Sequence, residues 1–311
     1  MAGNASAVLL FDKSPIYVYH LSITLLLYSK GQNKWRRIMA IITISRELAA
    51  LGDETAHALA GQLKYRYIDK ACLEERIKSY GVTNPKFQKF DEKKPSFWAS
   101  LSQDRDDYLH FLKSAVLAEA GQGNAVFIGR GAGVILRGVP GVFSVFLAAP
   151  PEIRLERVKS YFHCDDRRAH QIIEQSDRDR GGFHRYFFDV TWQDVGNYHL
   201  ALNTGHLHPD VCAEIVEYML DRTMTEEAEA QNTRRIEELS LAQSIKHHVL
   251  YEKELPIHFL EVSISDNRVF LYGVANAQPL IEAAVAYTVE LAHGYSVLPE
   301  IQVVQEYNIM P

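Results

Sequence analysis

The stretch MAIITISRELAALGDETAHALAGQL at residues 39–63 decides the fold class of this chain. Its first part, Ala40–Ile44, is a short β-branched and apolar run, which predicts a strand buried on both faces. The segment Glu54–Leu63 then repeats apolar residues at helical spacing. A buried strand that leads through a loop into an amphipathic helix indicates an α/β domain with a parallel sheet.

The same alternation of apolar strands and helices continues along the chain. Strands are predicted at Arg66–Asp69, Ala125–Ile128 and Phe143–Ala148, and helices at Ala71–Tyr80, Asp104–Ala120 and Glu152–Phe162. We therefore predict a three-layer α/β domain over residues 39–225. Residues 1–38 include an apolar run, Ile16–Tyr28, that is too short to span a bilayer. They are expected to form an N-terminal extension that is disordered or not native.

The composition of the sequence changes near Asp221, and a second structural unit is predicted after it. Residues 226–238 are acidic and polar, which is typical of a solvated linker or the start of a helix. Beyond them the pattern reads helix, strand, strand, helix, strand, with a turn at Asp266-Asn267 between the first two strands. Residues 226–311 are therefore expected to be a linker and a small α+β domain of αββαβ order.

The composition limits the class of protein. Of the 311 residues, 47% are hydrophobic and 23% are charged, which excludes a disordered or collagen-like chain. The net charge of −6 argues against a general nucleic-acid binder. Three cysteines without CxxC spacing indicate neither a disulfide framework nor a zinc site, so we assign no metal ligands and expect a cytoplasmic protein.

The loop after the first strand lies where a nucleotide-binding fold holds phosphate. The usual loop, GxxxxGK[ST], works through backbone N–H groups, a lysine and a hydroxyl group. Here no lysine is present, and Gly52 is the glycine that remains. The loop is either a plain strand-to-helix turn or a phosphate site that relies on the helix N-terminus, where Asp53 and Glu54 would oppose an anion.

Two further clusters could bind phosphate. Arg130 is flanked by glycines in residues 129–133, directly after a buried strand, and is either a phosphate ligand or a surface arginine in a glycine turn. Seven arginines between Arg154 and Arg185 alternate with aspartates, as in a salt-bridged surface helix or a mobile lid over a polyphosphate. Asp69 ends a strand and is either a substrate contact or a helix N-cap.

Together these segments resemble the cytidylate kinase-like family of nucleoside-monophosphate kinase relatives over about residues 39–222. The matching segments are ITISREL (42–48), YRYIDK (65–70), DEKKPSFW (91–98), FIGRGAG (127–133), AAPPEIRLERV (148–158), SDRDRGGFHRYFF (176–188) and NYHLALNT (197–204). Where relatives usually carry SREYGSGGRE, this chain has Ala49-Ala-Leu-Gly52 in place of the glycine-rich part.

The resemblance implies a P-loop kinase fold, ATP with Mg²⁺ as donor, and CMP or dCMP as acceptor. The residues that match place catalysis at Arg130, Arg178 and Arg180, cofactor binding at Ser45, Arg46, Gly52, Thr55, Arg154 and Arg157, and substrate binding at Asp69 and Arg130. The alternative is a catalytically impaired pseudokinase that binds or senses a nucleotide.

The C-terminal unit, about residues 232–306, is similar to a BON domain. The similarity lies in the strand-turn-strand SISDNRVFLYGVA at 263–275, the helix after it and the closing strand at 297–304. It implies a regulatory or binding module, with contact to phospholipid or a membrane surface as one role. The expected partner of the whole chain is a nucleotide substrate, not a nucleic acid.

Overall fold

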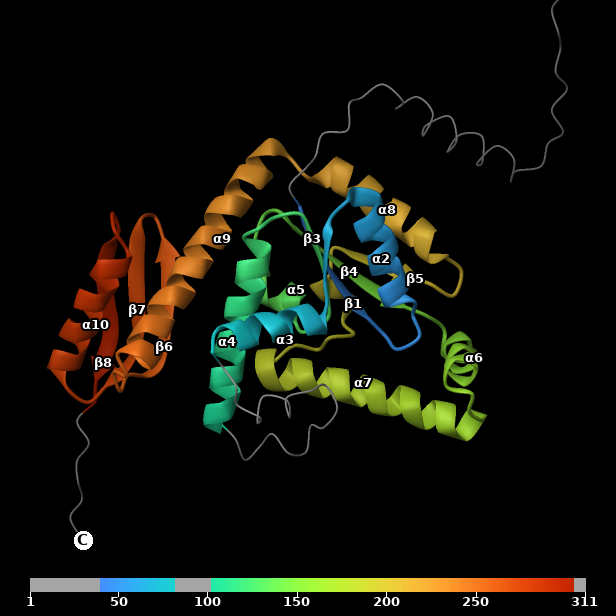
Figure 1. Cartoon of the computed structure of the whole chain (residues 1–311), viewed down its shortest axis with the longest axis horizontal. Helices are drawn as coiled ribbons and strands as arrows, with labels where there is room; N and C mark the ends of the chain where they lie inside the picture. Colours follow the sequence, from blue (N-terminus) through green and yellow to red (C-terminus); the bar gives the residue numbers. More distant parts are fainter. Residues whose placement is uncertain (1–39, 82–101, 305–311) are drawn as a thin grey trace, which may run out of the picture. The chain divides into compact units, whose positions relative to one another are not determined.

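The computed structural model describes residues 40–81 and 102–304 (Figure 1). The predicted N-terminal extension, the kinase-like segment at 91–98 and the last residues of the chain lie outside the described residues. Within the described ranges, no helix combines the length and the apolarity needed to cross a bilayer.

Five parallel strands form the main sheet, in the order β2-β3-β1-β4-β5. Helices separate consecutive strands along the chain and cover the sheet (Figure 1). The strands are β1 (Ile41–Arg46), β2 (Arg66–Ile68), β3 (Ala125–Ile128), β4 (Val142–Ala148) and β5 (Leu200–Asn203). This confirms the predicted parallel-sheet α/β domain.

The central strands are apolar on both faces because helices cover both faces. Ile41 and Phe127 contribute to one core, which also contains side chains of the helices α3, α4 and α7. Their neighbours Ile42 and Val126 are also fully buried, and successive residues of a strand point to opposite faces. The helices are α2 (Gly52–Leu63), α3 (Lys70–Ser79), α4 (Ser102–Ala120), α5 (Ala132–Ile135), α6 (Pro151–Phe162), α7 (Asp166–Phe188) and α8 (Pro209–Thr223), with a 3₁₀ turn η3 (Val195–Asn197).

Helix α7 bears on the two interpretations of the arginine-rich segment, which are a salt-bridged surface helix and a mobile lid. The helix runs without a break through Gly181-Gly182, and Phe183 and Phe187 are buried in the main core. The buried rings anchor the C-terminal half of the helix to the sheet domain. The arginine-rich segment is therefore two helices, α6 and α7, that pack against each other.

The C-terminal part has the predicted αββαβ order. Strand β6 is antiparallel to β7, and β7 is parallel to β8. Asp266 and Asn267 both have positive φ angles in the predicted β6–β7 turn, as a two-residue hairpin loop requires. The elements are α9 (Glu226–His247), a π-helical turn η4 (His248–Glu252), β6 (His258–Ser265), β7 (Arg268–Ala275), α10 (Gln278–Leu291) and β8 (Ser296–Val303).

Residues 226–238, predicted as a linker or a helix start, form the first half of α9. Thr225 caps this helix by accepting a hydrogen bond from the Ala228 N–H at 3.1 Å. Ile236 is buried in the core of the parallel-sheet domain, whereas Ile245 is buried in the core of the C-terminal sheet. One helix thus belongs to both cores, and the division at residues 225 and 226 remains a prediction.

Candidate functional site

The loop between β1 and α2 keeps a glycine-like backbone without the glycines. Ala49 and Leu51 have φ angles of 61° and 51°, in the left-handed region that glycine adopts most easily. The next residue is Gly52, where a Cβ atom would overlap the Arg46 side chain that lies across it. The loop at the carboxyl end of β1 therefore has a left-handed backbone at two positions that carry side chains in place of glycine.

Two arginines from α6 hold this loop by its carbonyl groups. The Arg154 Nε donates to the Leu48 carbonyl at 2.8 Å, and its guanidinium contacts both carboxylate oxygens of Asp177, each at 2.8 Å. Arg157 donates to the carbonyls of Ala49 at 2.9 Å and Thr204 at 2.7 Å. These side chains replace the conformational preference of glycine with side-chain hydrogen bonds from a neighbouring helix.

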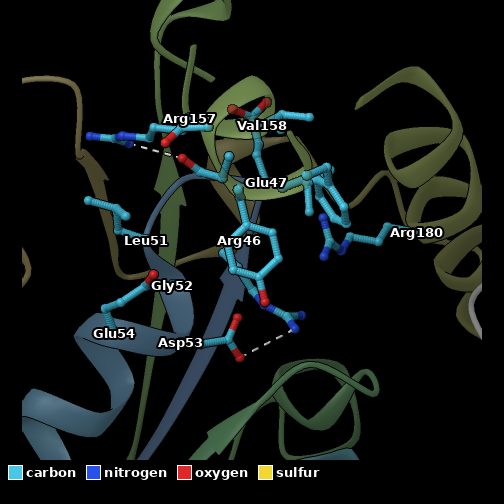
Figure 2. Close-up of a pocket in the computed structure, with 14 residues that line it drawn as sticks. Arg46, Glu47, Leu51, Gly52, Asp53, Glu54, Arg157, Val158 and Arg180 are labelled. Atoms are coloured by element: carbon cyan, nitrogen blue, oxygen red, sulfur yellow. Dashed lines mark hydrogen bonds and ion pairs between the residues drawn. The ribbon is translucent and has the colours of Figure 1, made fainter. Parts of the chain in front are cut away.

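A pocket of about 520 Å³ opens beside the loop (Figure 2). Its cationic lining residues come from three elements: Arg46 from the end of β1, Arg157 from α6 and Arg180 from α7. Its acidic lining residues are Glu47, Asp53 and Glu54. Three positive and three negative side chains therefore face the same space, and the pocket does not have the strong positive charge of a simple anion site.

Asp53 is held in place within this pocket. Its carboxylate lies 3.9 Å from the Arg46 guanidinium and accepts a hydrogen bond from the Tyr67 hydroxyl at 3.5 Å. Burial and the nearby Asp53 charge raise the pKa of Tyr67 to about 12, so the phenol stays protonated and can donate. Sequence reasoning did not select Tyr67, although it follows Arg66 in the short strand that was predicted.

The other residues assigned to cofactor binding, Ser45, Thr55 and Arg154, are not among the residues that line the pocket. The Thr55 hydroxyl is fully buried and donates to the Leu51 carbonyl at 2.8 Å, one turn back along α2. The Ser45 side chain is hydrogen-bonded to Tyr198. Arg154 is also buried, behind the loop. Of the assigned residues, Arg46, Gly52, Arg157 and Arg180 line the pocket itself.

The glycine-flanked arginine is not the surface residue that the glycine turn suggested. The Arg130 side chain is 3% exposed, donates to the Glu74 carboxylate at 2.9 Å and lies over the Phe183 ring. Gly131, with a φ angle of 67°, packs against Phe188, and a Cβ atom there would overlap the ring. The alternative of a surface arginine is therefore wrong, because side chains of α3 and α7 enclose Arg130.

Asp69 was assigned to substrate binding and Arg178 to catalysis, and the structure places them in different surroundings. The Asp69 carboxylate accepts a hydrogen bond from the Cys72 N–H at 2.9 Å, which makes it the N-cap of α3. Arg178 is 62% exposed and pairs with Glu174 one turn away on α7. Asp69 and Arg130 therefore both contact α3, whereas Arg178 lies on the solvent side of α7.

The family model described as "Cytidylate kinase-like family" matches residues 41–206, more than half of the chain, and this match includes the β1–α2 loop, Arg130 and the arginines of α6 and α7. The chain belongs to the cytidylate kinase-like family. A comparison with curated proteins found no match.

Solved structures similar to this cytidylate kinase-like chain include an uncharacterized protein from Eubacterium ventriosum. It is 20% identical, with a TM-score of 0.46, over 58% of this chain and 98% of that one. A shikimate kinase from Bacteroides thetaiotaomicron is 14% identical, with a TM-score of 0.37, and the match covers 58% of this chain and 98% of that one. A shikimate kinase from Acinetobacter baumannii in complex with shikimate is 14% identical, with a TM-score of 0.36, over 61% and 97%. Likeness at this level carries no information about the substrate.

Replacing Arg130 with alanine is expected to lower the free energy of unfolding by about 1–2 kcal/mol. The variant loses the hydrogen bond to Glu74 and the contact with Phe183, but Glu74 is half-exposed and can be hydrated. Urea unfolding measures the difference. Arg137→Ala is a suitable control, because Arg137 makes an exposed hydrogen bond to Asn197 from the adjoining segment. Equal stability of the two variants would show that Arg130 is not a packing residue.

Proposed function

We propose that this protein is a kinase that transfers a phosphoryl group from ATP to a nucleoside monophosphate, with CMP or dCMP as the acceptor. The observation that carries the proposal is the left-handed loop at the carboxyl end of β1, which opens into a pocket with arginines from β1, α6 and α7. Arginines from separate elements can surround a transferring phosphoryl group and stabilise its charge. Membership of the cytidylate kinase-like family supports the same reaction class.

The acidic residues of the pocket fit Mg²⁺ carried by a nucleotide. Magnesium prefers hard oxygen ligands and is usually held by one or two carboxylates together with substrate phosphates. Asp53 and Glu54 provide such carboxylates beside the loop, and the Asp53 side chain is 60% exposed. These two residues would hold the ion, which when bound neutralises phosphate charge. Within the described ranges no larger cluster of metal-ligating side chains occurs.

The second candidate function is that of a pseudokinase that binds a nucleotide without transferring phosphate. The observation that favours it is the balance of charges: three carboxylates face the three arginines, and no lysine is among the pocket-lining residues of the described chain. A lysine in the usual loop reaches the β- and γ-phosphates. Without one, the pocket could retain a nucleotide and still stabilise the transition state poorly.

The decisive experiment combines binding and turnover on the full chain. Calorimetry with ATP and Mg²⁺ measures binding, and transfer of labelled γ-phosphate to CMP, dCMP and UMP measures catalysis. The proposal expects ATP binding and labelled CDP or dCDP. Binding without transfer to any acceptor would support the pseudokinase, and the absence of ATP binding would contradict both candidates.

Replacing Asp53 with asparagine is expected to tighten the binding of metal-free ATP about tenfold, or about 1.4 kcal/mol. The substitution removes one carboxylate that repels phosphate and frees Arg46 from its ion pair. The binding of ATP with Mg²⁺ should not tighten, because the substitution also removes one of the two carboxylates that would hold the ion. Calorimetry in EDTA and in Mg²⁺ gives the two affinities for each protein.

A matched control for this prediction is Asp210→Asn. Asp210 is an exposed acidic residue in the first turn of another helix, α8, and is not among the residues that line the pocket. Its replacement changes the net charge by the same amount. If both variants tighten metal-free ATP equally, the effect comes from overall charge, and the local role of Asp53 is contradicted.

We further propose that the C-terminal domain is a BON-like binding module that contacts phospholipid. Its αββαβ order supports the resemblance, and Phe259 and Tyr272 expose aromatic surface on its sheet, 85% and 44% respectively. Co-sedimentation of the full chain with anionic vesicles tests this role. The loss of co-sedimentation in a Phe259→Ala variant would support the proposal, and the failure of the wild type to sediment would contradict it.

A further inference from the structure

Two aromatic side chains are exposed at the C-terminal end of α6. Tyr161 is 80% exposed and Phe162 is 47% exposed, although large aromatic side chains are usually buried. Their rings contact each other edge to face, with centroids 4.9 Å apart. Both residues line the pocket beside the β1–α2 loop.

Helical spacing explains why Tyr161 reaches this pocket. Residues Arg154, Arg157, Val158 and Tyr161 follow the i, i+3, i+4, i+7 pattern, which places them on one face of α6. The two arginines of this face bond to carbonyl groups of the loop, and Val158 lines the pocket next to Arg157. Tyr161 is one turn beyond Arg157, so it extends the same face past the loop into open space.

The pocket is lined by both charged and apolar side chains. Arg46, Arg157 and Arg180 are cations suited to phosphate, whereas Val158, Tyr161 and Phe162 offer apolar surface. A nucleotide has both kinds of group, with charged phosphates at one end and a flat aromatic base at the other. Stacking of a base on an aromatic side chain stabilises binding by about 1–3 kcal/mol.

We propose that Tyr161, supported edge-on by Phe162, is the stacking platform for the base of the nucleoside triphosphate whose phosphates lie at the β1–α2 loop. This inference rests on the proposed function, because it assigns the donor nucleotide to this pocket. A stacking platform contacts the π-face of a base and does not read the hydrogen-bonding groups on its edge. Tyr161 therefore sets a preference for large purine bases over pyrimidines, with little discrimination between adenine and guanine.

The test uses the full chain and three probes with Mg²⁺: ATP, GTP and inorganic tripolyphosphate, which has no base. Tyr161→Ala is expected to weaken the binding of ATP and of GTP by at least about fivefold each and to leave the binding of tripolyphosphate unchanged. Tyr161→Trp should retain the wild-type affinities, because it keeps an aromatic face. Tyr218→Ala serves as the control, since Tyr218 is also an exposed aromatic residue but lies on α8 and does not line the pocket.

The outcomes separate this inference from the proposed function. If the wild type binds ATP and tripolyphosphate but Tyr161→Ala binds ATP equally well, the platform is wrong and the phosphate site stands. An equal loss of ATP and tripolyphosphate in Tyr161→Ala would also overturn the platform, because the side chain would then act on the phosphate end. If the wild type binds neither probe, the proposed function fails, and the platform fails with it.

Discussion

Replacing Arg154 with methionine is expected to lower the free energy of unfolding by about 3–5 kcal/mol. The Arg154 side chain is 6% exposed and pairs with Glu47 and Asp177, which are 14% and 23% exposed. Methionine fills much of the same volume but leaves two poorly hydrated carboxylates without their cation. It also releases the Leu48 carbonyl, so the β1–α2 loop loses one of its two side-chain supports.

Urea unfolding of the full chain measures this effect, and Arg178→Met provides the control. Arg178 lies on the adjacent helix and forms an ion pair with Glu174 in which both side chains are exposed. Exposed ion pairs contribute little to stability. A second comparison adds Asp177→Asn to the Arg154→Met chain, which should recover part of the lost stability by removing one unpaired charge. Similar stability of Arg154→Met and Arg178→Met would contradict the role given to this buried ion pair.

Lowering the pH from 6.5 to 4.5 is expected to destabilise the protein by roughly 2–3 kcal/mol through His110 alone. Burial, with a smaller contribution from the nearby His247, lowers the pKa of His110 from its usual 6.5 to about 3. In the unfolded chain His110 takes up a proton as the pH falls below 6.5, whereas in the folded protein it stays neutral. The stabilisation is therefore fully present above pH 6.5 and is lost progressively as the pH falls toward 3.

The hydrogen bonds around His110 explain why the folded protein resists protonation there. The Gln243 amide nitrogen lies 2.7 Å from Nδ1 and also donates to the His110 carbonyl, so Nδ1 accepts. Nε2 therefore carries the proton and donates to the His247 Nδ1 at 3.1 Å. A second proton on the ring would face the Gln243 N–H. Other charged or titratable groups near this contact are Asp106, Asp107 and Lys113 on α4, Lys246 on α9, Tyr251 and Glu252 on η4, and Glu261 on β6.

The comparison that isolates His110 uses a His110→Gln variant, whose side chain does not titrate. Urea unfolding at pH 6.5 and 4.5 gives the stability lost on acidification, and the wild type should lose roughly 2–3 kcal/mol more than the variant. His208→Gln is the control, because His208 is 74% exposed. If wild type and His110→Gln lose equal stability between these pH values, His110 is not the source of the acid sensitivity.

Much of the fold could be predicted from local patterns. The apolar runs that became β1, β3 and β4 needed no tertiary information, because strands covered on both faces exclude polar residues. The αββαβ order and the turn at Asp266-Asn267 were equally visible, since turn residues and alternation are local signals. The role of helix α7 was harder to predict from the sequence. Two consecutive glycines and four aromatic residues do not show whether a segment forms a lid or part of a core.

The candidate site was predicted at the level of its elements but not of its side chains. The sequence alone located the loop after β1 and showed that it lacks lysine and most of its glycines. It could not show that Arg154 and Arg157 would bond to the carbonyl groups of that loop, because these residues are about 100 positions away along the chain. The spacing from Arg157 to Tyr161 predicts from the sequence that both lie on one face of a helix. It does not predict that the β1–α2 loop contacts this face, which only the structure shows.

The sequence by itself therefore determined the α/β class, the order of elements and the position of the loop after β1, since each follows from short-range periodicity and backbone preference. Only the tertiary structure decided that Arg130 is buried against α3 and α7, that Asp69 caps α3, and that His110 meets His247 between α4 and α9. The physical reason is that burial and charge pairing depend on which distant segments share a volume. That information lies in the packing of whole elements, and no local pattern contains it.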